Sequence, residues 1–225
     1  MLLFGRLYFR FFAILDVASK YVDIYFMNSP ALILASSSSR RQQLLDQLGI
    51  GYSVCEHNIQ ESRKTDESPE DLVLRLAIEK AEAGLKKQSA DNVLILGSDT
   101  IVVCDEAVFG KPFNKQDALR MLLILSGRSH RVLSAVSVMN KKERKSAFSD
   151  TQVEFRNISE IEVEHYWQTG EPADKAGAYA IQGFGAVFVK SIAGSYSGVM
   201  GLPLFEVAML LNDFGVPCWR PYKGL

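Results

Sequence analysis

The stretch VLILGSDTIVVC, residues 93–104, decides the fold class of this chain. Apolar residues on both sides of a short polar segment are typical of a strand buried on both faces of a sheet. A helical pattern precedes the stretch, from a Ser68 cap to about Gly84, and another follows it at 115–125 behind an Asn114 cap. Strand and helix therefore alternate, which predicts a mixed α/β fold.

The same alternation extends over most of the chain. Residues 31–35 are an apolar, strand-like run, and a serine loop after them leads into a helix that ends at Gly49. Farther along, the pattern predicts a hairpin with strands at 132–139 and 148–155 around a turn at 140–145, a short helix after Ser159, glycine-punctuated strand at 178–197, and a last helix between Pro203 and Gly215. We expect one central sheet flanked by helices.

Composition excludes several classes of protein. With 225 residues, 48% of them hydrophobic and 23% charged, the chain suits one large domain or two closely joined lobes. A net charge of -1 provides no general attraction to nucleic acid or to an anionic membrane, so any anionic ligand needs a local cluster of cations. The three cysteines lack a CxxC pair and the three histidines lack ligand spacing, which disfavours a zinc site and predicts a cytoplasmic protein.

Residues 1–28 differ from the rest. They are rich in aromatic residues, but charges such as Arg6 and Asp16 leave no apolar stretch of the ~18–20 residues that a membrane span needs. Two interpretations remain open: a start assigned upstream of a true start at Met27, or a peripheral amphipathic segment. We expect no membrane contact and divide the chain into an extension at 1–28, one domain at 29–217 and a tail at 218–225.

Two charged residues interrupt predicted buried surfaces. Asp99 lies inside the 93–104 stretch, where an ionised carboxylate needs a metal ion, a lysine or several donors; the alternative is an aspartate that satisfies a turn. Lys80 continues the apolar stripe of Val73 and Leu76 on the preceding helix. It must either extend to solvent or meet an anion.

The serine loop, Ser36 to Ser39, is a candidate anion site. Free N–H groups at the start of a helix bind anions, and the serine hydroxyls add donors. Arg40 and Arg41 lie at the positive end of that helix, which costs about 0.3–1 kcal/mol each unless an anion is bound. An ordinary serine cap beside solvated arginines is the alternative. The loop lacks the spacing of a P-loop.

Three further polar residues have weaker signals. Lys111 follows the central strand and could reach the same end of the sheet as Asp99. Glu61 looks like an ordinary surface glutamate. Gln182 carries both a donor and an acceptor, so it could read a base edge, and the glycines beside it would let a flat ligand approach. It could equally be a polar residue in a glycine-rich turn.

Taken in order, these segments resemble the Maf family of nucleotide pyrophosphatases. The matching segments are 34–45 (LASSSSRRQQLL), Glu61, 75–81 (RLAIEKA), 97–100 (GSDT), 110–112 (GKP), 125–127 (LSG), 174–179 (DKAGAY) and 199–203 (VMGLP). Each match is weak alone, but the ordered set is specific and covers nearly all of residues 31–215. Ser39 departs from the family pattern, which commonly has a proline there.

The resemblance implies a fold and an activity. The fold would be a two-lobed α/β structure with a cleft, laid out as in the inosine triphosphate pyrophosphatases, and the protein would be a homodimer. The activity would be hydrolysis of the nucleoside triphosphates dTTP and UTP to the monophosphate and pyrophosphate, with no nucleic acid bound. The alternatives are a Maf enzyme for 7-methyl-GTP or modified nucleotides, and a non-catalytic nucleotide-binding regulator of cell division.

The resemblance also implies roles for individual residues. The catalytic residues would be Asp99, Glu61, Lys80 and Lys111; the phosphate-binding residues Ser36, Ser38 and Arg41; and the specificity residues Arg40, Thr100 and Gln182. Asp99 and Glu61 would also hold a divalent cation, for which oxygen ligands favour magnesium or manganese. Which carboxylate binds metal and which accepts a proton is left open.

Overall fold

The computed structural model describes residues 30–56 and 58–219. The chain divides into two units, residues 1–30 and 31–225, and the strands and helices of the described residues belong to the second unit. The expected extension at residues 1–28 lies outside the described residues, as does most of the expected tail. The start of that tail packs on the domain, because the backbone N–H of Trp219 donates to the carbonyl of Leu48 over 2.9 Å.

A seven-stranded mixed sheet forms the centre of the unit. Its strand order is β2-β1-β3-β5-β6-β7, with β4 paired to β3. Only β1 makes parallel pairs, with β2 and β3, and the other pairs are antiparallel. The strands are β1 (Ala31–Leu34), β2 (Tyr52–Val54), β3 (Val93–Cys104), β4 (Ala107–Phe109), β5 (Ser129–Met139), β6 (Arg144–Phe155) and β7 (Val189–Ala193). The mixed α/β prediction is confirmed.

Helices cover the sheet, and four of them begin at caps that the sequence contains. Ser38, Ser68, Asn114 and Ser159 each accept a hydrogen bond from a backbone N–H three residues on, as N-caps do. The helices are α2 (Ser39–Asp46), α3 (Pro69–Leu85), α4 (Lys115–Leu125), α5 (Glu160–Gln168), α6 (Tyr196–Met200) and α7 (Leu204–Asp213), with 3-10 turns η1 (Glu171–Asp174), η2 (Ala176–Ala178) and η3 (Phe184–Phe188).

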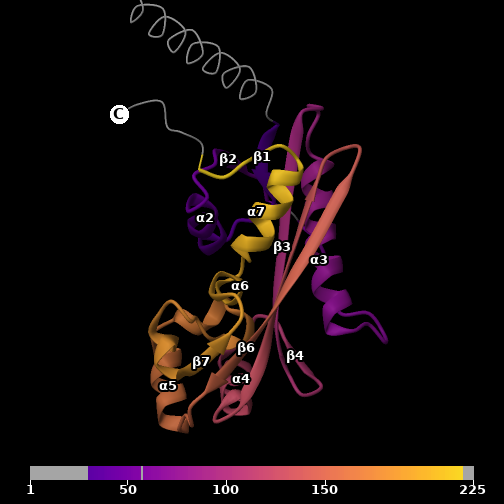
Figure 1. Ribbon diagram of the computed structural model, residues 1–225. Coiled ribbons are helices and arrows are strands. Elements are labelled where there is room, and N and C mark those ends of the chain that lie inside the picture. Colours follow the sequence, from indigo (N-terminus) through magenta and orange to yellow (C-terminus); the bar gives the residue numbers. More distant parts are fainter. Residues whose placement is uncertain (1–29, 57, 220–225) are drawn as a thin grey trace, which may run out of the picture. The chain divides into compact units, whose positions relative to one another are not determined.

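The two faces of β3 pack against different helices (Figure 1). On one face, Ile101 and Val103 pack in a cluster with residues of α3. On the other face, Leu94 and Leu96 belong to a cluster with α2 and α7, whereas Val102 belongs to a cluster with α4 and α5. The polar segment of β3 falls between those two apolar clusters. The polar residues in the middle of β3 therefore lie between two separate hydrophobic cores on this face of the sheet.

Two expectations about secondary structure need correction. The hairpin strands are longer than predicted, since β5 and β6 meet at a turn that begins at Asn140 and ends at Glu143. The segment 178–197, predicted as strand, contains only β7 as strand and otherwise forms 3-10 turns and a short helix. Positive φ angles of 62° at Ala178 and 132° at Gly194 break the extended backbone there.

Candidate active site

A pocket opens where the edge of β3 is left unpaired. On that edge β1 pairs with residues 93–96 and β4 with residues 102–104, so residues 97–101 pair only with β5 on the other side. The pocket there has a volume of about 330 Å³. Nine of the ten predicted site residues line it: Ser38, Arg40, Arg41, Glu61, Lys80, Asp99, Thr100, Lys111 and Gln182. The structure therefore brings together segments that are far apart in the sequence.

Lys80 joins the two predicted catalytic carboxylates. Its Nζ lies 2.6 Å from Oδ1 of Asp99 and 2.7 Å from Oε1 of Glu61. The side chains of Lys80 and Asp99 are 5% and 7% exposed, whereas that of Glu61 is 48% exposed. Lys80 thus meets anions rather than extending to solvent, and Asp99 lies in a continuous strand rather than in a turn. Both alternatives for these two residues are wrong.

Gly97 explains how α3 comes close enough for this contact. A Cβ added at Gly97 would lie 2.3 Å from the carbonyl oxygen of Ala77 and 2.6 Å from the backbone nitrogen of Ala81. Only glycine therefore lets the backbone of α3 rest directly on β3.

Burial sets the electrostatics of the site. It raises the pKa of the Asp99 carboxyl above its ordinary value, although Lys80 and Arg41 act in the opposite direction. Burial also lowers the pKa of the Arg41 guanidinium, against the attraction of Asp99 and Glu61. A carboxylate with a raised pKa holds a proton more readily than an exposed one, which suits a group that accepts a proton from water.

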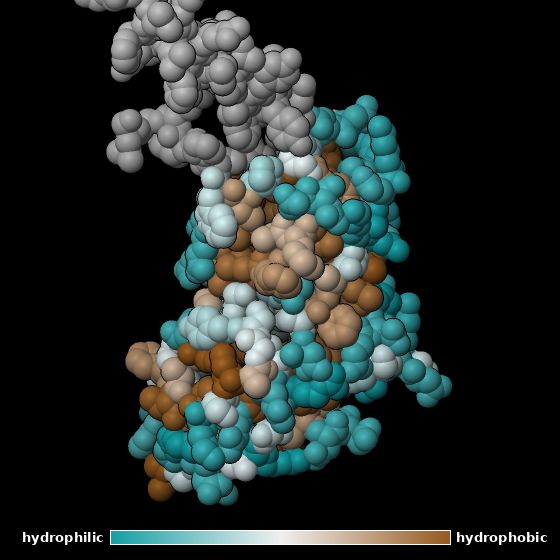
Figure 2. Space-filling model, viewed as in Figure 1, coloured by the Kyte–Doolittle hydropathy of each residue, from teal (hydrophilic) through white to brown (hydrophobic). Residues whose placement is uncertain are grey.

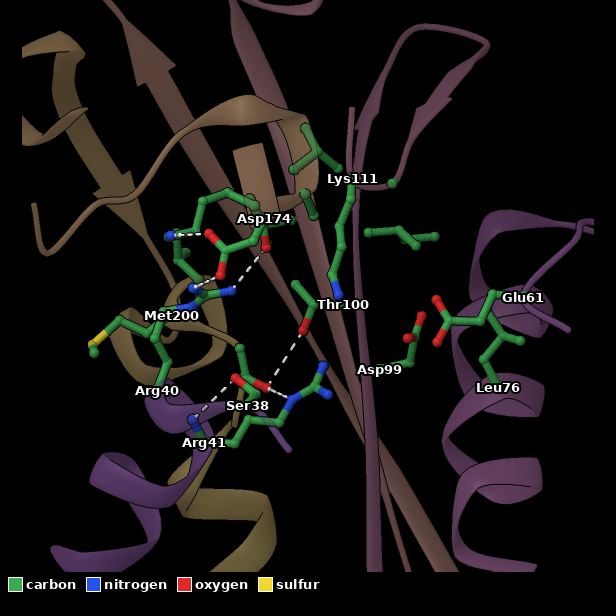
Figure 3. Close-up of a pocket in the computed structure, with 18 of the residues that line it drawn as sticks. Ser38, Arg40, Arg41, Glu61, Leu76, Asp99, Thr100, Lys111, Asp174 and Met200 are labelled. Carbon is green, nitrogen blue, oxygen red and sulfur yellow. Dashed lines mark hydrogen bonds and ion pairs between the residues drawn. The ribbon is translucent and has the colours of Figure 1, made fainter. Parts of the chain in front are cut away.

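The two arginines after the serine loop have separate structural partners. Arg41 donates from Nε to the carbonyl of Gly201 over 2.9 Å and from its terminal nitrogen to Ser36 Oγ over 3.3 Å. Arg40 forms an ion pair with Asp174 at 2.8 Å. Neither is simply solvated. Ser36, expected at the phosphates, is instead buried and accepts the hydrogen bond from Arg41. Ser38 caps α2 and lines the pocket (Figure 3).

The three predicted specificity residues reach the pocket from different elements. Thr100 Oγ1 shares a hydrogen bond with Ser134 Oγ over 2.8 Å and lies 3.4 Å from the carbonyl oxygen of Gly201. Gln182 lines the pocket and is exposed. The glycines next to it do not admit a ligand as expected. A Cβ at Gly183 would lie 2.0 Å from Glu171, and one at Gly185 would lie 2.6 Å from the hydroxyl of Tyr166, so protein atoms already fill that space.

Comparison with known proteins agrees with this arrangement. A sequence model described as "Maf-like protein" matches residues 31–214. The chain belongs to the Maf family. A protein of Vibrio parahaemolyticus is 50% identical over 186 residues, 83% of this chain and 98% of that protein, and one of Saccharophagus degradans is 49% identical over 195 residues, 86% of this chain and 93% of that protein. Both are named dTTP/UTP pyrophosphatase.

A third relative, from Alkalilimnicola ehrlichii, carries the same name at 48% identity over 195 residues, which are 85% of this chain and 96% of that protein. Among solved structures, the Staphylococcus aureus Ham1 protein superimposes with a TM-score of 0.41 and 15% identity, over 56% of this chain and 71% of that chain. That structural likeness is too weak to bear on the Maf fold.

Three charged residues of the Maf pocket were not assigned a role from sequence. Arg63, Asp174 and Lys175 also line it, which brings the lining to six cationic and three acidic side chains: Arg40, Arg41, Arg63, Lys80, Lys111 and Lys175 against Glu61, Asp99 and Asp174. Asp174 and Lys175 begin the DKAGAY segment, which matches the family pattern and could have identified them as site residues. Arg63 lies in a polar loop, and no feature of the sequence there indicates a role in the site. The excess of cations is the local cluster that an anionic ligand requires in a protein of nearly zero net charge.

A half-buried ion pair holds the loop that carries Glu61 in this Maf domain. Glu67 accepts from Arg75 at 2.6 Å and 2.8 Å, and Arg75 also donates to the carbonyl of Ser62 over 3.0 Å. The loop is thereby tied to α3, next to Lys80. The hydrogen bonds from Arg75 lower the pKa of Glu67 from 4.5 to about 2.

Replacing Glu67 with glutamine is expected to lower the free energy of unfolding at pH 7 by about 1–2 kcal/mol. A carboxyl with a lowered folded-state pKa stabilises above its unfolded pKa of 4.5, and that contribution is lost as the pH falls towards about 2. Denaturant titrations should therefore show a difference between variant and wild type that narrows below pH 4.5. Glu82→Gln is the control, because Glu82 lies on α3 in an exposed ion pair with Arg144. This variant should change the free energy of unfolding little. A constant difference at every pH would contradict this account.

Among residues 30–56 and 58–219, no helix combines the length and the apolar character needed to cross a membrane. Over the same residues, no group of three or more histidine, cysteine, aspartate or glutamate side chains is arranged to hold a metal ion by itself. Asp99 and Glu61, which both contact Lys80, are the carboxylates of this Maf pocket that could hold a cation together with oxygens of a ligand. Magnesium is commonly bound in that way, through one or two carboxylates and substrate phosphates.

Proposed function

We propose that this Maf protein hydrolyses dTTP and UTP to the monophosphate and pyrophosphate. The observation that carries the proposal is the pocket itself, which lies at an open sheet edge and is lined by six cations together with the buried Asp99 carboxylate that Lys80 contacts. The dTTP/UTP name of relatives about half identical over most of the chain supports this specificity over 7-methyl-GTP. The retained acidic and basic residues support an enzyme over a non-catalytic regulator of cell division.

The residues divide the chemistry among themselves. Water attacks the α-phosphorus, the bridging bond to the β-phosphate breaks, and pyrophosphate leaves. Asp99 accepts the proton of the attacking water. Lys80 holds Asp99 in place, and together with Lys111 and Arg41 it stabilises the negative charge that develops on the phosphate oxygens. Ser38, at the start of α2, offers its hydroxyl and the free N–H groups of the helix to a phosphate.

A divalent cation, magnesium or manganese, is part of the proposal. Asp99 and Glu61 would hold it, since their carboxylates converge on one Lys80 Nζ and therefore lie close together. When bound, such a cation neutralises charge on phosphate oxygens and lowers the pKa of a bound water. Glu61 is the more exposed of the two carboxylates, so a metal ion from solution can reach it directly.

Removal of the cation is expected to stop the reaction. Purified protein treated with EDTA should lose pyrophosphate release, and excess magnesium or manganese should restore it. The physical reason is that two carboxylates alone bind the ion weakly without substrate, so a chelator competes effectively. Undiminished activity in EDTA would contradict the role of the cation but not the proposed pyrophosphatase reaction.

The decisive experiment for the function is a panel of triphosphates with product identification. Purified protein with magnesium should release pyrophosphate from dTTP and UTP faster than from dCTP, dGTP and 7-methyl-GTP. Orthophosphate as the product would place the cleavage at a different bond and overturn the proposed reaction. Preference for 7-methyl-GTP or a modified nucleotide would retain the reaction and overturn the specificity.

Gln182→Ala should weaken the preference for thymine and uracil. Loss of one neutral hydrogen bond to the base edge would reduce the ratio of kcat/KM for dTTP over dCTP by about 3- to 10-fold. Because Gln182 does not contact Asp99 or Lys80, kcat should change less than KM. Steady-state kinetics with both nucleotides measure this. An unchanged ratio would show that another residue reads the base.

The expected homodimer and cytoplasmic location stay part of this proposal. Figure 2 shows hydrophobic surface in the regions of α7 and β7. Exposed apolar side chains include Phe205 and Met209 on α7 and, just before β7, Phe184 and Val187 on η3. Such side chains are a feature of surfaces that bind a partner. Light scattering during size-exclusion chromatography would give the oligomeric state.

A further inference from the structure

The turn η1, residues Glu171–Asp174, connects residues from several parts of the pocket. Asp174 binds Arg40 through its carboxylate at 2.8 Å and through its carbonyl at 3.1 Å. The carbonyl of Glu171 accepts from Nζ of Lys175, a pocket residue, over 3.1 Å. The side chain of Glu171 faces the loop that carries Gln182. One short turn therefore contacts the surroundings of two proposed specificity residues, Arg40 and Gln182.

The Glu171 carboxylate accepts three hydrogen bonds, two of them from the backbone of that loop. One oxygen accepts from the hydroxyl of Tyr166 over 2.7 Å and from the backbone N–H of Gly185 over 3.0 Å. The other accepts from the backbone N–H of Phe184 over 3.0 Å. Hydrogen bonds to an ionised acceptor are stronger than neutral ones. The carboxylate thus fixes the backbone directly after Gln182.

Tyr166 fixes the same loop on its other side. Its hydroxyl accepts from the backbone N–H of Ala180 over 3.1 Å while it donates to Glu171. The tyrosine is buried, and both burial and its bond to Glu171 raise the pKa of its hydroxyl, so it stays a donor at neutral pH. Backbone groups are therefore held on both sides of Gln182, at Ala180 and at Phe184.

The tight packing of the two glycines shows that this arrangement is specific. Gly183 and Gly185 have no room for a Cβ, because the Glu171 carboxylate and the Tyr166 hydroxyl lie where it would be. The glycine-rich sequence around Gln182 thus serves the contact with these two side chains. These contacts fix the backbone of the loop before and after Gln182.

We propose that Glu171 is a positioning residue for base selection, which acts by fixing the 180–185 loop and through it the amide of Gln182. The inference rests on the proposed function, since it assigns the origin of the base preference within the same site. It predicts that a change at Glu171 alters which base is preferred, not the rate of the chemical step at Asp99.

Glu171→Gln tests the inference with minimal change of shape. An amide group offers N–H donors to backbone N–H donors, so at least one of the three contacts must break. We expect the kcat/KM ratio of dTTP over dCTP to fall by about 3- to 10-fold, mainly through KM for dTTP. Glu164→Gln is the control, because this glutamate on the adjacent α5 pairs with Lys115 at the surface. It should leave the ratio unchanged.

A double-mutant cycle separates positioning from a merely structural role. In a Gln182→Ala background, Glu171→Gln should have no further effect on the base ratio, because its influence passes through Gln182. If Glu171→Gln does not fold, Tyr166→Phe removes the hydroxyl from both contacts and should shift the ratio in the same direction. An unchanged ratio in a folded Glu171 or Tyr166 variant, or an additive effect in the cycle, would overturn the inference.

Binding of α,β-imido analogues of dTTP and dCTP, which the proposed reaction cannot cleave, distinguishes failure of the proposed reaction from failure of the positioning role of Glu171. Wild type that prefers the thymidine analogue but releases no pyrophosphate would contradict the proposed reaction alone. In that case loss of the binding preference in Glu171→Gln still supports the positioning role, and a retained preference overturns it.

Discussion

Replacing Asp99 with asparagine is expected to lower pyrophosphate release from dTTP by about 10²- to 10⁴-fold, the usual contribution of a general base. Asparagine keeps the shape of the side chain and can still accept from Lys80, but it cannot take a proton from water. Lys80 keeps its ion pair with Glu61 in this variant, so its buried charge still has a partner and the variant should fold. Single-turnover release of pyrophosphate measures the chemical step directly.

Asp91→Asn is the matched control for this variant. Asp91 is 91% exposed and pairs with Lys141 at the surface, so the same chemical change there should leave the rate unaltered. Wild-type activity in a folded Asp99→Asn protein would remove Asp99 from the reaction. The pocket would then need a different proton acceptor, and Glu61 is the remaining carboxylate beside Lys80.

Local patterns predicted the elements of this fold well because their signals are short in range. Caps such as Ser68 and Asn114 satisfy backbone groups within three residues, so the sequence around them is sufficient. Asp99 and Lys80 stood out because each places a charge on an apolar surface, and such charges must find partners. The sequence indicated that each needed a partner, and the structure shows that they partner each other.

The contacts that the sequence could not predict are made by residues whose neighbours in the sequence give no indication of a distant partner. Glu171 looks like a surface glutamate before a proline, yet it accepts three hydrogen bonds from residues 5 to 14 positions away. Ser36 was one of four adjacent serines, and only the packing of Arg41 distinguishes it. The glycines around Gln182 predicted space, but nothing in the pattern showed that the protein itself occupies that space.

Replacing Lys80 with methionine is the second change of large expected effect. Methionine matches the length of the lysine stem but leaves Asp99 without its buried cation. Pyrophosphate release should fall by about 10²- to 10³-fold, because the variant loses a charge that stabilises the transition state and orients the proton acceptor. The free energy of unfolding at pH 8 should fall by about 3–5 kcal/mol, as when one partner of a buried pair is removed.

The loss of stability in Lys80→Met should depend on pH in a defined direction. Lys80 is the strongest influence that lowers the pKa of Asp99, so its removal raises that pKa further. An acid with a raised folded-state pKa stabilises the protein below its unfolded pKa of about 3.9, and this is lost as the pH rises through the folded value. The deficit against wild type should therefore be small near pH 4 and grow towards pH 8, in denaturant titrations with EDTA present. The double variant with Asp99→Asn has no ionisable group at position 99, so its stability should lose this pH dependence. A deficit that is equal at both pH values, or that survives in the double variant, would mean that Asp99 and Lys80 are not energetically coupled.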